Sequence, residues 1–266
     1  MTVWVNGRLV DAGVVDATDR GFTLGDGLFE TVRVQEGKPV LFDRHLARLR
    51  DGARVLDIPV PATDAALAGA VAALLAAEGM AEGHIRITLT RGPAPRGVLP
   101  PASPNPTLLI AGGPIAAAAP VRLVIAESTR RNELSPLCRV KSLNYLDNIL
   151  ARQEAARRGA DDAVLLNTAG RVVETTISNL FAVIDGRLVT PPVAEGALPG
   201  IMRGVLVERM AAVERPIAPE ELRCATAVIL TNSLGIRAVV ALDGAPCGAA
   251  TELARQAEAV AARLSA

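Results

Sequence analysis

The chain has 266 residues, of which half are apolar, 2% are aromatic and 21% are charged. These figures describe an ordinary globular protein and exclude a disordered or fibrous one. The 28 basic and 28 acidic side chains cancel, and few aromatic residues are present to stack on bases, so we expect neither a nucleic acid nor an anionic membrane as partner.

Cysteine usage and hydropathy indicate a cytoplasmic protein. The three cysteines form no metal-ligand spacing and no disulfide framework, as expected in a reducing compartment. The N-terminus lacks the basic and apolar regions of a signal peptide. The longest apolar stretch, 65–77, is shorter than the about 20 residues that a membrane-spanning helix needs.

The first half of the chain alternates strands and helices, with hairpin signals at Asn6-Gly7 and around Gly37. In chain order we expect strands 3–5, 8–10, 31–35 and 40–42, helices from Asp43 and over 64–77, and strands 84–90 and 107–111. The stretch 111–120, rich in Gly, Ala and Pro, indicates a linker.

The second half continues the mixture of strands and helices. We expect strand 121–126, helix 144–158, hairpins with turns at 168–170 and 185–186, a helix from near Gly200, strand 226–230 and helix 249–264. The pattern predicts a mixed α/β protein with a small N-terminal domain over 1–115, a linker over 116–120 and a larger domain over 121–266 that carries Lys141.

Lysine is rare in this sequence: Lys38 and Lys141 stand beside 26 arginines. Where only a solvated positive charge is needed, such a chain uses Arg, so a retained lysine can serve as a nucleophilic amine. Lys38 lies in a predicted hairpin turn, and we interpret it as solvated. Lys141 follows Val140 at the start of a predicted helix and is the candidate catalytic amine, with a snorkelling side chain as the alternative.

An amine that forms an imine with a cofactor needs a phosphate site and an acid–base partner for the cofactor ring. A helix that opens after Pro199-Gly200 leaves the backbone amides of Ile201 and Met202 to face a phosphate, although most helix starts bind only a cap or water. Glu174 ends an otherwise apolar strand, where a solvated strand end is the alternative.

Arg48 lies on the predicted helix that begins at Asp43, where a solvated helix face is the ordinary interpretation. His45 and His84 have no partner pattern, and we interpret both as structural. The sequence therefore offers no Ser-His-Asp set and no metal site to compete with the lysine.

These motifs, in this order, resemble the class IV aminotransferases, which are fold-type IV pyridoxal-phosphate (PLP) enzymes. The family includes branched-chain aminotransferases, D-amino-acid aminotransferases and 4-amino-4-deoxychorismate lyases. The resemblance covers nearly the whole chain in the blocks 19–22 and 25–31, 45–49, 90–92 and 95–97, 140–145, 174 and 178–181, 198–203, and 230–233.

The resemblance implies a two-domain fold like that of D-amino-acid aminotransferase, a homodimer, PLP as cofactor and a small amine or amino acid as substrate. Lys141 matches the Schiff-base lysine, which also acts as general base. The other positions matching cofactor-binding residues are Arg48, Tyr145, Glu174, Ile201, Met202, Asn232 and Ser233. Those matching substrate-binding residues are Phe29, Thr31, Arg96 and Val98. Tyr145 departs from the branched-chain pattern by one residue.

Three features favour the lyase branch within this family. Met202 stands where aminotransferases usually have Thr, and 231–234 lacks their Thr-rich run. The Tyr, Arg and His that hold the substrate carboxylate in D-amino-acid enzymes correspond here to Phe29, Arg96 and Val98. We therefore expect a lyase of folate biosynthesis that releases pyruvate and 4-aminobenzoate from 4-amino-4-deoxychorismate.

Two alternatives stay open. The block 141–144 and Arg96 also fit an aminotransferase that acts on D-amino acids, branched-chain amino acids or small primary amines. A non-catalytic PLP-binding protein on the same fold is the remote alternative, because a fold does not fix a function.

Overall fold

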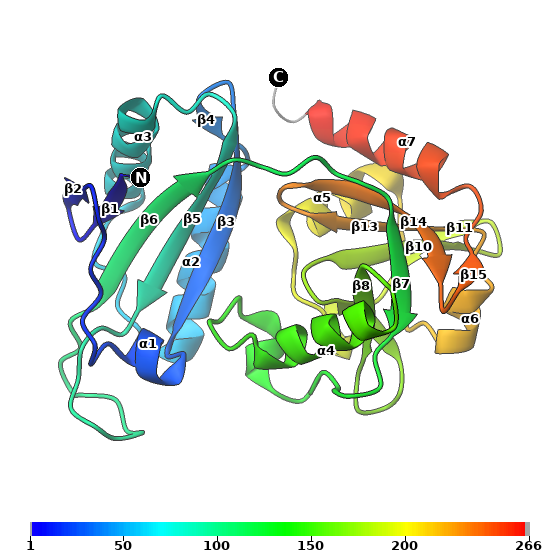
Figure 1. The fold of residues 1–266 in the computed structure, drawn as a ribbon, viewed down its shortest axis with the longest axis horizontal. Coiled ribbons are helices and arrows are strands. Elements are labelled where there is room, and N and C mark those ends of the chain that lie inside the picture. The colour runs from blue at the N-terminus through cyan, green and yellow to red at the C-terminus, as the bar shows by residue number, and fades with distance from the viewer. Residues whose placement is uncertain (1, 264–266) are drawn as a thin grey trace. The chain divides into compact units, whose positions relative to one another are not determined.

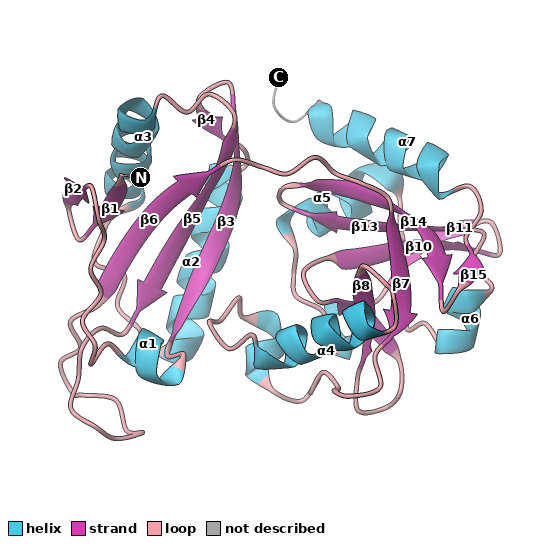
Figure 2. Cartoon of the chain, viewed as in Figure 1, coloured by secondary structure: helices cyan, strands magenta, loops and turns pink. Residues whose placement is uncertain are grey.

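The computed structural model describes residues 2–263, and by its contacts the chain divides into two compact units (Figures 1 and 2). Unit 1 runs up to Ala116 and also includes Val140–Asn144, and unit 2 consists of Ala117–Arg139 and the chain from Tyr145 onward. Each unit combines a β-sheet with helices, which confirms the predicted mixed α/β class.

Unit 1 is built on an antiparallel sheet. Its elements are β1 (Val3–Val5), β2 (Arg8–Val10), α1 (Arg20–Leu24), β3 (Gly27–Gln35), β4 (Lys38–Pro39), α2 (Phe42–Leu56), α3 (Asp64–Glu78), β5 (Gly83–Thr90) and β6 (Thr107–Gly113). Within the described residues the sheet has six strands in the order β2-β1-β6-β5-β3-β4. The long strands β3, β5 and β6 pair in register along most of their length.

Helices α2 and α3 pack on one face of this sheet (Figure 1). Leu46 and Leu49 of α2 and Leu74 of α3 share a fully buried core with Ile85 and Ile87 of β5. Strand side chains alternate between the two faces, so this core takes every second residue of β3, beginning with Leu28. The intervening residues of β3 lie on the face that α2 and α3 leave open.

Unit 2 has a larger, mixed sheet. Its strands are β7 (Val121–Ile125), β8 (Asp162–Leu166), β9 (Val172–Thr175), β10 (Asn179–Ile184), β11 (Arg187–Thr190), β12 (Val213–Glu214), β13 (Ala227–Asn232), β14 (Gly235–Leu242) and β15 (Ala245–Pro246). Its helices are α4 (Leu146–Arg157), α5 (Ile201–Met210), α6 (Pro219–Arg223) and α7 (Ala250–Ala262), with 3-10 helices at Pro136–Arg139 and Val193–Glu195. Eight strands run in the order β12-β11-β10-β13-β14-β7-β8-β9, and β15 pairs with β14.

Apolar clusters within the sheet and under its helices stabilise unit 2. Helices α5 and α7 pack against β13 and β14, where Leu206, Ile229 and Ala257 are fully buried. Helix α4 packs on β8 through Ala151 and Ala155, whose small side chains allow the helix to approach the sheet closely. The rigid strands β9, β10 and β13 carry the polar residues described below.

Several predicted boundaries differ from the structure. The predicted strand 40–42 is wrong, because Leu41 adopts a left-handed backbone and α2 begins at Phe42. Strand β3 begins at Gly27 rather than 31, β6 continues to Gly113 into the expected linker, and α4 begins two residues after the predicted start. Strand β14 was not predicted, and the predicted end of the last helix at 264 lies outside the described residues.

The segment around Lys141 belongs to unit 1, whereas the predicted domain over 121–266 included it. The reason is backbone pairing, since Ser142 forms a β-bridge with Leu28 and Val140 packs in the core of unit 1. The domain boundaries themselves stay a prediction. In the part of the chain that the structure describes, no helix is both long and apolar enough to cross a membrane.

Candidate active site

Lys141 is held in unit 1 by its own backbone. The carbonyl of Lys141 accepts a hydrogen bond from the Phe29 amide at 2.9 Å, and the amide of Leu143 donates to the Gly27 carbonyl at 2.9 Å. The segment therefore runs beside the start of β3 like an added strand. Its side chain is half-buried, and Nζ lies 4.3 Å from the centroid of the Phe29 ring.

Phe29, Thr31 and Arg86 share the face of the sheet opposite α2 and α3. Thr31 pairs with Arg86 across β3 and β5, and the guanidinium carbon of Arg86 lies 3.6 Å from the centroid of the Phe29 ring. The structure thus brings together two predicted substrate residues, the candidate amine and an arginine that the sequence analysis did not select. Two basic side chains therefore lie over one aromatic ring, in the arrangement of cation–π contacts.

Arg48 contacts the opposite side of the sheet, where it closes a buried triad with Glu30 and His45. Nε of Arg48 donates to Oε1 of Glu30 at 2.8 Å, and Nη2 donates to Oε2 at 2.7 Å. Nδ1 of His45 lies 2.6 Å from the same Oε2. Burial by itself would raise the pKa of Glu30, but the charge of Arg48 and the hydrogen bond from His45 hold it at about 2. His45 therefore orients a charged pair, in agreement with its structural interpretation.

Glu30→Gln is expected to flatten the acid dependence of stability. Between pH 2 and pH 4.5, Glu30 is protonated in the unfolded chain but ionised in the folded protein. Its contribution to the free energy of unfolding therefore rises with pH in this range. In the variant, we expect the slope of the free energy of unfolding against pH to be smaller by about 1.4 kcal/mol per pH unit. Urea unfolding at several pH values in this window measures the slope.

Glu154 provides the matched reference for this measurement. Its pKa is also about 2, because hydrogen bonds from Ser128, Glu127 and Arg158 outweigh the effect of burial. Glu154→Gln should therefore flatten the slope to a similar extent. The ion pair described for Glu30 would be contradicted if the free energy of unfolding of Glu30→Gln kept the pH slope of the wild type while that of Glu154→Gln became flatter.

Arg96 and Val98 lie on the long connection between β5 and β6. Both side chains are exposed, and the backbone of this connection is held by Arg20, described below. Arg96 and Val98 are therefore placed by loop geometry rather than by a strand, unlike Phe29 and Thr31 on β3.

Glu174 lies at the end of β9 in unit 2 and is buried. Its Oε1 accepts hydrogen bonds from Nη2 of Arg131 at 2.8 Å and from Nε of Arg131 at 3.2 Å. Its Oε2 accepts hydrogen bonds from the Leu198 amide at 3.1 Å and from Nδ2 of Asn179 at 3.2 Å. Every one of these partners donates, so the arrangement stabilises an ionised carboxylate. The solvated alternative for Glu174 is wrong, because the side chain is buried.

Helix α5 begins next to this carboxylate, as the bond from the Leu198 amide to Glu174 shows. Gly200 is its N-cap residue and provides no side-chain acceptor for the first amides, those of Ile201 and Met202. A Cβ at Gly200 would lie 2.0 Å from Oδ1 of Asn179, so a glycine is needed for this close approach. The helix start therefore has no side-chain cap and, with the positive end of the helix dipole, is of a kind that can bind an anion.

Asn232 is the last residue of β13 and Ser233 follows it; β13 pairs with β10 so that Thr231 lies opposite Asn179. Nδ2 of Asn232 donates to the Ser178 hydroxyl at 3.1 Å, and the Asn232 carboxamide oxygen accepts from the Leu234 amide at 2.9 Å. Among the described residues, Oγ1 of Thr231 is buried and has no hydrogen-bond partner. Strands β9, β10 and β13 thus connect Glu174, the start of α5 and this turn within unit 2.

Tyr145 stands immediately before α4 and is half-buried. Its backbone carbonyl accepts a hydrogen bond from the Ile149 amide at 2.9 Å, as expected for an N-cap residue. Lys141 belongs to unit 1 and Tyr145 to unit 2, although only three residues separate them. Tyr145 therefore begins the second unit.

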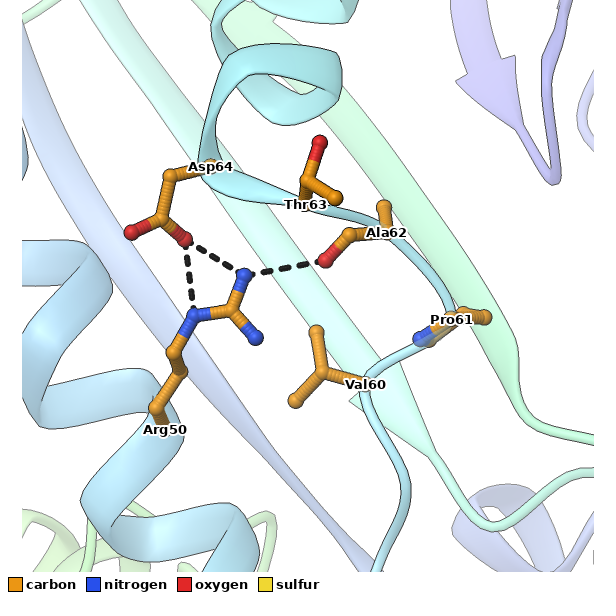
Figure 3. Close-up of a pocket in the computed structure, with 6 residues that line it drawn as sticks. All are labelled: Arg50, Val60, Pro61, Ala62, Thr63 and Asp64. Atoms are coloured by element: carbon orange, nitrogen blue, oxygen red, sulfur yellow. Dashed lines mark hydrogen bonds and ion pairs between the residues drawn. The ribbon is translucent and has the colours of Figure 1, made fainter.

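A pocket on unit 1 contains none of the predicted site residues (Figure 3). It is lined by Arg50, Val60, Pro61, Ala62, Thr63 and Asp64. Arg50 crosses it and donates to Oδ1 of Asp64 and to the Ala62 carbonyl, as the dashed lines show. The ion pair of Arg50 is internal to the pocket, so its charge is already compensated by the protein.

The fold of the chain is that of the fold-type IV PLP-dependent enzymes. The chain belongs to the class IV aminotransferase family, since the family model described as amino-transferase class IV matches residues 27–242. Members of this family are PLP enzymes, both aminotransferases and lyases. The resemblance seen in the sequence motifs is thereby confirmed at the level of family and fold.

Three known proteins illustrate the similarity. The 4-amino-4-deoxychorismate lyase of Pseudomonas aeruginosa is 38% identical, with a TM-score of 0.84 and 97% of both chains covered. The branched-chain aminotransferase of Escherichia coli is 26% identical, with a TM-score of 0.90 and 97% of this chain and 92% of that chain covered. The D-alanine aminotransferase of Bacillus licheniformis is 29% identical over 265 residues, which cover 93% of this chain and 90% of the relative.

Proposed function

We propose that this protein is a PLP-dependent 4-amino-4-deoxychorismate lyase that releases pyruvate and 4-aminobenzoate, a folate precursor. The products together contain all the atoms of the substrate, so the reaction requires no oxidant and no keto acid. The branched-chain and D-alanine enzymes are relatives of the same family, and the distinction from them depends on the residues of unit 1.

The described residues fit PLP. An uncapped start of α5 and a buried Thr231 hydroxyl without a partner leave donors for a phosphate, and the buried Glu174 carboxylate suits a protonated ring nitrogen. Lys141 offers the amine for covalent attachment. The residues proposed to hold the cofactor are Lys141, Glu174, Tyr145, Ile201, Met202, Asn232 and Ser233. Arg48 matches the family's phosphate-binding arginine, but two of its guanidinium nitrogens bind the Glu30 carboxylate in this structure.

Bound PLP supplies an electron sink for negative charge on the substrate carbon that bears the amine. When PLP is bound, Nζ of Lys141 would serve as the general base that takes the proton from that carbon. Arg131, Asn179 and the Leu198 amide all donate to Glu174 and fix the position of its carboxylate. Arg131 is therefore a positioning residue, which fixes the carboxylate and compensates its charge in a buried site.

One observation carries the choice of the lyase: the group of side chains around Phe29. D-amino-acid enzymes hold a small α-carboxylate with Tyr, Arg and His, and here Phe29 and Val98 cannot donate. Each lost charge-assisted bond is worth about 1.5–3 kcal/mol, so capture of a small amino acid is weakened. The Arg86 guanidinium instead lies against the Phe29 ring, which suits aminodeoxychorismate, a cyclohexadiene with one carboxylate on the ring and a second on the enolpyruvyl group that leaves as pyruvate.

The lyase of Pseudomonas aeruginosa, 38% identical over 97% of both chains, supports the proposal. Met202 supports it as well, because aminotransferases usually carry Thr there. The motif 141–144 and the D-alanine aminotransferase relative favour instead an aminotransferase that acts on D-amino acids. Both activities would use the same Lys141, so only turnover separates them.

Incubation of the purified protein with aminodeoxychorismate is expected to release pyruvate and 4-aminobenzoate in equal amounts without a keto acid. Lactate dehydrogenase coupling and chromatography measure the two products. Arg86→Ala is expected to raise KM by about tenfold, the effect of one charge-assisted bond, because one carboxylate loses its cation.

Amino transfer from D-alanine to 2-oxoglutarate, in place of 4-aminobenzoate release, would overturn the lyase assignment and establish the aminotransferase. Transfer from a branched-chain amino acid or from a small primary amine would overturn it in the same way. Absorbance of bound PLP without either reaction would show a cofactor-binding protein that is not an enzyme.

A further inference from the structure

Arg20, a residue of α1, holds the loop that carries Arg96 and Val98. Nη1 of Arg20 donates to the Gly97 carbonyl at 2.7 Å, and Nη2 donates to the Val98 carbonyl at 2.8 Å. The two acceptors are consecutive, so the planar guanidinium fixes both the position and the direction of the backbone between them. Arg20 lies 77 and 78 residues before these two acceptors in the sequence, so the contact depends on the tertiary fold and could not be predicted from local sequence.

The guanidinium of Arg20 is itself fixed by a buried network. Nε of Arg20 donates to Oδ2 of Asp26 at 2.7 Å, and Nε of Arg91 donates to the same oxygen at 2.8 Å. Arg20 is 4% exposed. Burial would raise the pKa of Asp26, but Arg91 and Arg20 lower it below its ordinary value. Because the donors of this buried guanidinium are paired with Asp26 and with the two loop carbonyls, its position is fixed, and the loop backbone is fixed with it.

The loop has little else to define its conformation. Val98 and Leu99 are 85% and 88% exposed, so packing into the core does not hold them. Neither β5 nor β6 extends to these residues. The polar contacts of the two backbone carbonyls with Arg20 therefore determine where the Arg96 and Val98 side chains are presented.

We propose that Arg20 is a positioning residue that fixes the 96–98 backbone and thereby sets substrate affinity and selectivity through Arg96 and Val98. This inference rests on the proposed function insofar as Arg96 and Val98 contact the substrate. Without the two bonds from Arg20, the loop populates several conformations, and Arg96 meets a substrate carboxylate in only some of them. The loss appears in KM and in selectivity, while the proton transfer at Lys141 keeps its rate.

Trypsin provides a direct test on the purified protein, because the bond between Arg96 and Gly97 lies in the anchored loop. Arg20→Lys keeps the charge beside Asp26 but cannot bind both carbonyls, and we expect cleavage at this bond to become at least about tenfold faster, the effect of one lost charge-assisted bond. Mass spectrometry of the fragments identifies the site. Unchanged cleavage in a folded Arg20→Lys protein would overturn the proposal.

Arg91→Lys is the matched control. Arg91 is as buried as Arg20 and binds the same Asp26, but its other donors bind the Leu56 and Asp57 carbonyls instead of the loop. We expect Arg91→Lys to lower the thermal stability without accelerating cleavage after Arg96. Equal acceleration in both variants would indicate general loosening of unit 1 and would also overturn the proposal.

Gly97→Ala tests the same loop if Arg20→Lys does not fold. Gly97 has a φ of +153° with open space around its missing Cβ, so alanine strains the backbone at the anchored carbonyl without a clash. Both variants should raise KM about tenfold, through a weakened contact of Arg96, with kcat within about twofold of wild type.

The proposal has two parts, the anchoring of the loop by Arg20 and the role of the loop in substrate binding. Each can be tested whether or not the protein is a lyase. Cleavage after Arg96 needs no substrate, so it tests the anchoring whether the protein is a lyase or an aminotransferase. KM is measured with aminodeoxychorismate or, if that is not turned over, with D-alanine. Faster cleavage with an unchanged KM would refute the role of the loop in substrate binding. A fall in kcat alone would refute it as well.

Discussion

Lys141→Ala is expected to abolish covalent attachment of PLP and to reduce kcat by at least about 10³-fold. The wild-type protein should be yellow, and borohydride should fix the colour on the chain as a stable secondary amine. In the variant the adduct should be absent from the intact mass. We expect this loss because the proposed function gives one side chain two roles, the anchor of the cofactor and the base that moves the proton.

The structure makes this variant a clean test. Lys141 pairs with β3 through its backbone carbonyl, which an alanine retains, so unit 1 keeps its fold. Lys38 is the matched control, since it is the other lysine of the sequence and is exposed on the short strand β4. Lys38→Ala should retain colour, adduct and turnover. A reduced adduct in Lys141→Ala would mean that another group holds the cofactor.

The sequence predicted the elements that depend on local patterning. The Asn6-Gly7 turn, the amphipathic helix α2 and the Ala-rich helix α3 are confirmed, because turn chemistry and helical spacing act within a few residues. The predicted strand 40–42 is wrong because Leu41 adopts a left-handed backbone, which residue type did not signal. Strand β14 was missed because a nearly continuous apolar run does not distinguish a strand from a helix.

The contacts around the candidate residues could not be predicted in the same way. Arg131 and Glu174 are 43 residues apart, and nothing in either local sequence pairs them. The link between Arg20 and the Val98 carbonyl likewise depends on the return of β5 beside β3. Lys141 was found through composition and motif order, but its backbone pairing with Phe29 follows from tertiary structure alone. The residue roles stay predictions from the resemblance, whereas the groups that position these residues required the fold.

Glu174→Gln is expected to reduce kcat by about 10²–10³-fold, the range found when one preorganised electrostatic partner is removed from an active site. The carboxylate accepts from Arg131, Asn179 and the Leu198 amide, and a glutamine can offer only one oxygen to these donors. Its amide group must then face a donor, and the charge of Arg131 is left uncompensated in a partly buried site. The ring nitrogen of bound PLP would lose its anionic partner.

The expected signature differs from that of Lys141→Ala. Lys141 is intact, so the Glu174→Gln protein should bind PLP covalently and remain yellow while turnover falls. A lowered kcat with KM within about threefold of wild type would indicate that Glu174 acts on the reaction rather than on substrate binding. Titration of the absorbance of bound cofactor against pH should also change, since a carboxylate beside the ring nitrogen stabilises its protonated form.

Glu154→Gln separates this effect from a general loss of a buried carboxylate. Glu154 resembles Glu174 in its surroundings, since it is buried and accepts from the Ser128 amide at 2.9 Å and from Arg158 at 2.9 Å. It belongs to α4 and is no part of the predicted site. Its variant should lose stability near neutral pH, where the ionised carboxylate contributes, but keep kcat and the cofactor spectrum. If both variants lowered kcat alike, the effect would come from unit 2 as a whole, and Glu174 would have no specific role at the ring nitrogen.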